Sequence, residues 1–138
     1  MPLTPGLSAR AELVVSEADT AASLGSGDVA VLGTPRLVAL CEEAAFAAVQ
    51  SRLPEGETSV GNGVQFNHVS PTAVGAKVVA EATLERIEGR RLSFTVSAHD
   101  PAGLVGAGRV SRVVVDRDRF LAKIRPDSTT AGTPPKGR

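Results

Sequence analysis

The sequence predicts an α+β fold in which one long helix packs against an antiparallel β-sheet. Residues 34–53 repeat apolar side chains at the 3.6-residue spacing of a helix, whereas residues 58–115 alternate at the two-residue spacing of strands. Short turns that contain Gly or Pro separate the later strands. Strands joined in this way pair as hairpins, and successive hairpins build an antiparallel sheet.

The chain has 138 residues, which is enough for one domain with a hydrophobic core. We expect a single domain over residues 1–125. Residues 126–138 are rich in Pro, Gly, Ser and Thr and offer little to bury, so we expect a disordered tail there.

The composition argues against several classes of partner. Fifteen basic and fifteen acidic residues cancel, and Trp and Tyr are missing, so neither the charge nor the stacking surfaces of a nucleic-acid-binding protein are present. No apolar run approaches the roughly 20 residues that cross a bilayer, and the start of the chain does not look like a signal peptide. One cysteine leaves no internal disulfide. We therefore predict a soluble, cytoplasmic protein with no nucleic-acid or membrane partner.

The segment before the long helix is expected to hold one strand and a loop. Residues 1–9 are predicted to be extended, and residues 11–15 have the composition of a strand. Ser16 and Asp19 have the spacing of a capping box, which predicts a short helical turn. Glycines at 25 and 27 predict a flexible loop that leads into the helix.

The long helix has clear start and stop signals. Thr34 is predicted to cap it with its hydroxyl, and Pro35 suits the first helical position because it needs no hydrogen-bond donor there. Pro54 and Gly56 predict an end near Leu53. Small side chains on one face would let the helix lie close to a sheet, and that face comprises Leu37, Leu40, Cys41, Ala44, Ala45 and Ala48.

Glu42 does not follow the usual separation of polar and apolar faces. Its neighbours one turn away are Val38 and Phe46, so we expect partial burial, which costs a carboxylate free energy unless a partner compensates. Glu43 lies on a different face and is expected to be solvated. The alternative, that both are ordinary surface charges, stays open from the sequence.

Four strands are predicted after the helix. Gly61 and Gly63 interrupt the first, at residues 58–67, and two glycines inside a strand indicate a bulge or the close approach of another group. A loop over 68–75 follows, then strands with turns at 88–89 and 100–103, and either a short helix or an extended cap over 116–124. The three later strands are predicted at residues 77–87, 91–99 and 104–115.

Thr34, Glu42 and His68 are the residues best suited to chemistry. A hydroxyl, a carboxylate and an imidazole can act as a hydrogen-bonding group, a base or nucleophile, and a proton carrier. His99 is expected to be solvated, and Cys41 is interpreted as a buried structural residue, although a nucleophilic role is the alternative. Zinc-binding spacings are absent, so no metal is expected. Whether the three groups meet depends on the fold.

Several segments together resemble the hotdog-fold acyl-CoA thioesterases, and in particular the fluoroacetyl-CoA thioesterase-like group. The similarity extends over about residues 10–125. The matching segments are Thr34-Pro35, Glu42-Glu43-Ala44-Ala45, Ser59-Val60-Gly61, His68 with Pro71-Thr72 and Gly75, Gly89-Arg90-Arg91-Leu92-Ser93-Phe94, and Arg112-Val113-Val114-Val115 with Phe120.

This resemblance implies a hotdog fold, one long helix wrapped by a curved antiparallel β-sheet, in a homodimer with active sites at the subunit interface. It implies hydrolysis of an acyl-CoA to a free acid and coenzyme A, with no separate cofactor. Matched position by position to the family, it implies that Thr34, Glu42 and His68 are the catalytic residues. It also implies that the Gly61 backbone N–H polarises the thioester carbonyl. Arg112 is placed near the coenzyme or the acyl end. Two roles stay open for Glu42, direct attack on the carbonyl and activation of water.

One segment departs from the fluoroacetyl branch, which places bulky aromatic residues before the helix as a lid over a very small acyl group. Residues 23–32 contain no aromatic side chain here. We therefore predict a different short or medium acyl substrate. Two alternatives to this enzyme are a non-catalytic hotdog module that binds an acyl-CoA or other small ligand, and, less favoured by Thr34, a hotdog hydratase or dehydratase.

Overall fold

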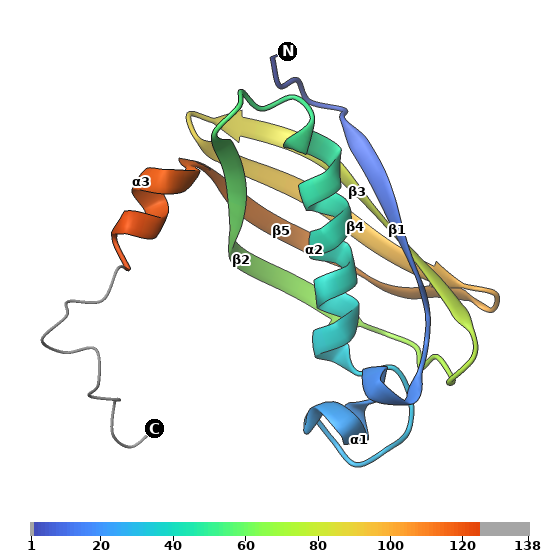
Figure 1. The fold of residues 1–138 in the computed structure, drawn as a ribbon. Coiled ribbons are helices and arrows are strands. Elements are labelled where there is room, and N and C mark those ends of the chain that lie inside the picture. Colours follow the sequence, from blue (N-terminus) through green and yellow to red (C-terminus); the bar gives the residue numbers. More distant parts are fainter. Residues whose placement is uncertain (1, 125–138) are drawn as a thin grey trace, which may run out of the picture.

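The computed structural model describes residues 2–124, and these form one curved five-stranded sheet with a long helix in its concave face (Figure 1). The strands lie in the order β1-β3-β4-β5-β2, and every neighbouring pair is antiparallel. The tail predicted at residues 126–138 lies outside the described residues. The strands are β1 (Ser8–Val14), β2 (Glu57–His68), β3 (Lys77–Glu88), β4 (Arg91–Asp100) and β5 (Gly103–Asp116).

Tight turns join β3 to β4 and β4 to β5, as the sequence predicts. The first strand after the helix behaves differently. β2 pairs with β5 and not with its successor β3, so residues 69–76 cross the end of the sheet. As a result β2 lies at one edge of the sheet and β1 at the other.

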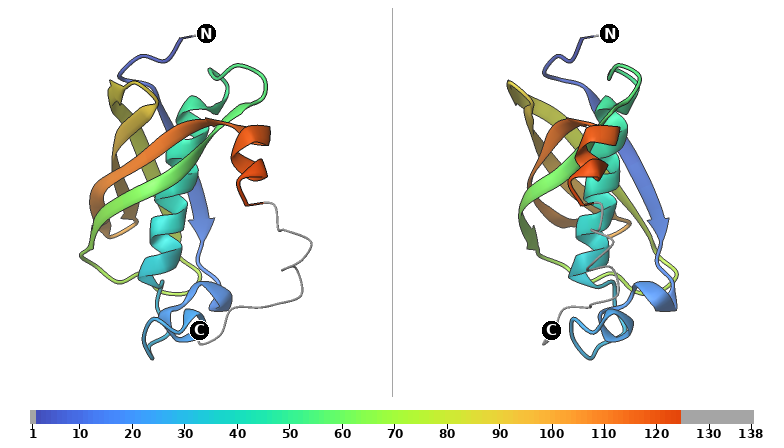
Figure 2. Two further views of the ribbon diagram at one scale, coloured as in Figure 1. Left: turned by 90° about the vertical axis from the view of Figure 1, so that its left-hand side faces the viewer. Right: turned by 60° about the vertical axis from the view of Figure 1, so that its left-hand side comes forward.

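Helix α2 (Thr34–Gln50) carries the small-residue face that the sequence predicts. Figure 2 shows the strands curving around this helix. The helix ends at Gln50, three residues before the predicted end, and residues 51–53 form a turn ahead of Pro54. Its buried residues are Leu37, Leu40, Cys41, Ala44, Ala45, Ala48 and Val49. They pack on alternating sheet residues such as Leu84 and Phe94, which is how one face of an antiparallel sheet is buried.

Short helical elements occupy the segment between β1 and α2. The backbone N–H of Ser16 donates to the Asp19 carboxylate at 2.8 Å, which confirms the predicted turn, η1 (Glu17–Asp19). Arg36 of α2 pairs with Asp19 at 3.2 Å, so this turn is attached to the start of the long helix. After it come α1 (Ala21–Leu24) and a loop with Gly25 at φ +76°. Of the two alternatives predicted for residues 116–124, the structure has the short helix, α3 (Arg117–Ala122), and not the extended cap.

The outer edge of β2 has no strand beside it within residues 2–124. Residues 61–65 of this strand are exposed, and Val64 leaves 45% of its surface open. An open strand edge is a template for pairing with another chain. Separately, none of the helices in residues 2–124 has the length and apolar character needed to cross a membrane.

Candidate active site

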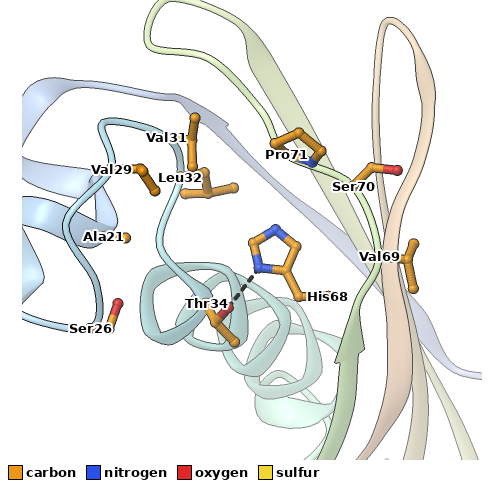
Figure 3. Close-up of a pocket in the computed structure, with 10 residues that line it drawn as sticks. All are labelled: Ala21, Ser26, Val29, Val31, Leu32, Thr34, His68, Val69, Ser70 and Pro71. Carbon is orange, nitrogen blue, oxygen red and sulfur yellow. Dashed lines mark hydrogen bonds between the residues drawn. The ribbon is translucent and has the colours of Figure 1, made fainter.

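Thr34 and His68 form a hydrogen-bonded pair at the start of α2. Thr34 Oγ1 lies 2.7 Å from Nδ1 of the His68 ring, which ends β2 (Figure 3). The prediction that Thr34 caps the helix is wrong, because Gly33 occupies the N-cap position and Thr34 is the first helical residue. A Cβ at position 33 would lie 2.9 Å from Cδ1 of Leu24 and 3.1 Å from the Ala21 backbone, so a side chain there would be crowded on both sides. The Thr34 hydroxyl is therefore directed to the imidazole.

The pair lies in a cavity of about 300 Å³ between the loop before α2 and the segment after β2. Figure 3 shows the imidazole between Thr34 and Pro71. The lining residues are Ala21, Ser26, Val29, Val31, Leu32, Thr34, His68, Val69, Ser70 and Pro71. A mostly apolar lining with a few convergent polar groups is typical of a small-molecule site.

The surroundings of the His68 ring favour its neutral form. Desolvation lowers the pKa of this imidazole below its usual value of 6.5, and an interaction with the Ser70 backbone partly opposes the shift. The ring is therefore neutral near pH 7. Its Nε2 atom is buried and has no hydrogen-bond partner among the described residues. A buried polar atom without a partner costs free energy, so a bound ligand that pairs with Nε2 would be favoured.

Glu42 belongs to a second cluster, farther along α2. It is half-buried, whereas Glu43 is exposed, as the sequence predicts. Its carboxylate lies directly against Gly61, where an added Cβ would overlap Oε2 of Glu42 and lie 3.6 Å from Nη1 of Arg112. Among the described residues, Glu42 makes no side-chain hydrogen bond or ion pair. The hydrogen-bonding capacity of this carboxylate is therefore unused among the described side chains.

Arg112 lies opposite Gly61 on β5 and is 7% exposed. Its Nε donates to the Ser59 hydroxyl at 2.8 Å and its Nη2 to the Ser59 carbonyl at 2.9 Å. The guanidinium stacks 5.6 Å from the centre of the Phe46 ring. Burial lowers the pKa of Arg112 and the charge of Glu42 opposes that shift, so the cation and the carboxylate favour each other.

The two clusters stay apart within one protomer. Thr34 and Glu42 are eight residues apart on α2, about 12 Å along the axis, and Gly61 and His68 are seven apart on β2, about 23 Å. The structure thus joins Thr34 with His68, and Glu42 with Gly61 and Arg112. It does not bring all five predicted residues together in a single chain.

The glycines of β2 behave as their positions predict. The register of the β2–β5 pair shifts between Gly61 and Gly63, which confirms a bulge, and the Glu42 carboxylate is the group that approaches Gly61 closely. A bulge bends a strand and redirects its side chains, and bulges are frequent beside active sites.

Replacing Gly61 with Ala is expected to leave the fold intact and to displace the Glu42 carboxylate, because the new methyl group takes its place. For the catalytic role of Glu42 that the sequence predicts, a shift of about 1 Å corresponds to a loss of kcat of about a hundredfold or more. The displaced atom is the end of a flexible side chain, so the backbone need not move. Gly63→Ala is the matched control, since its Cβ would lie 2.7 Å from the Ser111 hydroxyl and away from Glu42. Equal kcat losses in the two variants would contradict this account.

The surroundings of Cys41 and His99 argue against a catalytic role for either residue. Burial raises the pKa of the Cys41 thiol to about 12, with Glu42 adding to the shift, so the thiolate needed for attack is not populated. His99 is exposed at the end of β4, as predicted. Among residues 2–124 no group of three or more His, Cys, Asp or Glu side chains is placed to hold a metal ion.

A long helix wrapped by an antiparallel sheet, with a Thr–His pair and a carboxylate at the open strand, defines a hotdog domain of the thioesterase type. The chain belongs to the fluoroacetyl-CoA-specific thioesterase family, whose model matches residues 15–118. It is 39% identical over 102 residues to the fluoroacetyl-CoA thioesterase of Streptantibioticus cattleyicolor, covering 74% of this chain and 73% of the relative. These matches confirm the predicted resemblance and the thioester hydrolase class.

Solved structures give the same result for the fold. A structure of the fluoroacetyl-CoA thioesterase FlK superimposes with a TM-score of 0.84 at 32% identity, over 91% of this chain and 97% of that one. A hypothetical protein from Thermus thermophilus, a thioesterase superfamily member, superimposes with a TM-score of 0.83 at 30% identity, over 90% and 92% of the chains. The predicted hotdog fold is therefore confirmed.

Proposed function

We propose that the chain hydrolyses a short or medium acyl-CoA thioester to a free acid and coenzyme A, at a site shared by two copies in a homodimer. Thr34 and His68 would come from one subunit, and Glu42, Gly61 and Arg112 from the other. The observation that carries the proposal is the open edge of β2, because this one strand holds both Gly61 and His68.

A two-fold axis through the edge of β2 would unite the clusters. In an isologous dimer the two β2 strands pair antiparallel, so residues before the axis in one copy face residues after it in the other. If the axis passes near Val64 and Gln65, His68 lies opposite Gly61 of the partner subunit. Cα atoms that face each other across antiparallel strands are about 5 Å apart. The exposure of Val64 (45%) and Phe46 (37%) supports an interface here.

The groups then suit a thioester. The Gly61 backbone N–H stabilises the oxyanion in both roles that stay open for Glu42. As a base, Glu42 takes a proton from the water whose oxygen forms the new C–O bond as the C–S bond breaks, and the His68 ring, held by the Thr34 hydroxyl, relays that proton to the coenzyme A sulfur. As a nucleophile, Glu42 forms a mixed anhydride and expels the coenzyme A thiolate; water then cleaves the anhydride and restores the carboxylate, and His68 passes the proton from that water to the thiolate. Because Arg112 is buried against Ser59, we assign it to the acyl end and not to the coenzyme phosphates.

The loop before α2 supports an acyl group other than fluoroacetyl. Val29, Val31 and Leu32 line the cavity from this loop, and residues 23–32 carry no aromatic ring that would fill it. Solved structures of FlK variants contain acetyl-CoA in one case and fluoroacetate with coenzyme A in another. We extend the acyl-CoA class to this chain and place its activity in the cytoplasm, where Cys41, the one cysteine, stays reduced.

Release of free thiol from an acyl-CoA panel tests the activity, with acetyl-, fluoroacetyl- and longer acyl-CoAs compared by kcat/KM. We expect turnover without strong preference for fluoroacetyl-CoA, and His68→Ala should lower kcat/KM by about 10² to 10⁴. His99→Ala, which removes the other histidine, should leave the rate unchanged. Light scattering should give twice the 14.1 kDa chain mass. Tight acyl-CoA binding without turnover would instead support a non-catalytic module, and a monomer would contradict the shared site.

A further inference from the structure

Thr72 is a buried polar residue that the mechanism above does not use. It is 2% exposed and lies four residues after His68, in the segment that crosses from β2 to β3. Its hydroxyl donates to Oδ2 of Asp100, at the end of β4, at 2.8 Å. A hydroxyl-to-carboxylate bond is charge-assisted and therefore stronger than a bond between neutral groups.

Asp100 is itself held in a fixed orientation. Its second oxygen, Oδ1, accepts from the backbone N–H of Ala102 at 2.8 Å, inside the turn between β4 and β5. An aspartate that binds the backbone two residues ahead forms an Asx turn. One carboxylate oxygen is thus committed to the turn, and the other is directed at Thr72.

The backbone of Thr72 is hydrogen-bonded to the segment that leads into Thr34. Its carbonyl accepts from Leu32 N at 2.9 Å, two residues before Thr34, and Val31 and Ala73 form an isolated bridge beside it. On the other side, the N–H groups of Val69 and Ser70 both donate to the Val105 carbonyl, at 2.8 and 3.2 Å.

These bonds close a ring. It runs from His68 along the backbone to Thr72, across one hydrogen bond to Leu32, along the backbone to Thr34, and across the 2.7 Å contact back to the His68 ring. Backbone pairing of His68, Val69 and Ser70 attaches one side of this ring to β5, and the side chain of Thr72 attaches the other side to the turn after β4, through Asp100.

We propose that Thr72 and Asp100 form a clamp that sets the position of the His68 imidazole against the Thr34 hydroxyl, and that both act as positioning residues for hydrolysis. Neither touches the reacting atoms. Without the clamp the crossing segment keeps its backbone bonds but loses its attachment to the turn after β4, so the imidazole moves relative to the start of α2. Their role in turnover rests on the thioesterase function proposed above, whereas their effect on His68 does not.

Thr72→Val tests the clamp, and Thr58→Val is its matched control. Thr58 is also a buried threonine, 8% exposed, whose hydroxyl donates to a side chain, Gln50, at 3.3 Å, but it lies at the opposite end of β2. Both substitutions remove one buried hydroxyl and preserve shape. We expect Thr72→Val to lower kcat about tenfold or more with little change in KM, because a displaced catalytic group costs rate and not binding. Thr58→Val should alter only the melting temperature, and Thr72→Ser should restore most of the rate.

The imidazole signals provide a readout that does not need turnover. The chain has two histidines, so a His99→Gln background leaves His68 as the one ring in the nitrogen NMR spectrum. Thr72→Val and Asp100→Ala should shift the His68 ring signals in the same direction, and Thr58→Val should not. Unchanged signals, or a kcat loss no greater than that of Thr58→Val, would overturn the clamp. Absent wild-type turnover would count against the proposed function alone, since the NMR comparison still decides the clamp.

Discussion

Glu42→Gln is expected to lower kcat by about a thousandfold, which is within the range for loss of a catalytic base or nucleophile. The substitution keeps the size of the side chain and its position against Gly61, but the amide neither accepts a proton nor attacks a carbonyl. The carboxylate makes no hydrogen bond or ion pair within residues 2–124, so the interaction lost is its favourable charge with the buried Arg112. We therefore expect a modest fall in melting temperature beside the much larger loss of rate.

Glu43→Gln is the control for this experiment. The two acids are neighbours on α2, but Glu43 is exposed and lies on another face of the helix. We expect it to retain nearly full kcat in the same thiol-release assay. If Glu42→Gln kept more than about a tenth of the wild-type rate, its carboxylate would not be the group that attacks or activates water.

The burial of Glu42 was predictable because it depends on local spacing. Its apolar neighbours on α2 are fixed by the helical period, and the same period identified the face that packs on the sheet. The bulge at Gly61 was likewise predictable, since two glycines weaken a strand wherever it is placed. In each case the signal lies within a few residues of the feature.

Other features depend on groups that are distant in sequence. Position 33, the N-cap of α2, suits a glycine because Ala21 and Leu24 crowd the place of a Cβ, and nothing near residue 33 in the sequence reveals that contact. The pairing of β2 with β5 likewise joins segments that are far apart in the sequence, and strand patterns identify strands but not their partners. The Thr72–Asp100 bond joins two residues 28 positions apart, one in the segment between β2 and β3 and one at the end of β4, and neither segment is unusual on its own.

The separation of the two clusters leads to the experiment with the largest expected contrast. If each site takes Glu42 from one subunit and His68 from the other, inactive Glu42→Gln and His68→Ala chains should regain activity when refolded together. Random pairing gives about half heterodimers, and each would hold one intact site and one doubly defective site, so the mixture should reach about a quarter of the wild-type kcat.

Thr34→Val mixed with His68→Ala provides the matched control, because these two residues act from the same chain, 2.7 Å apart. In that heterodimer one site lacks the hydroxyl and the other lacks the imidazole, so no intact site forms and the activity should stay at the level of the parents. The comparison separates a shared site from one contained in a single protomer. The opposite result would overturn the shared site: recovery when Thr34→Val is mixed with His68→Ala, and none when Glu42→Gln is mixed with it. That result would place Glu42 and His68 of one chain in the same site, although roughly 23 Å of strand separates Gly61 from His68.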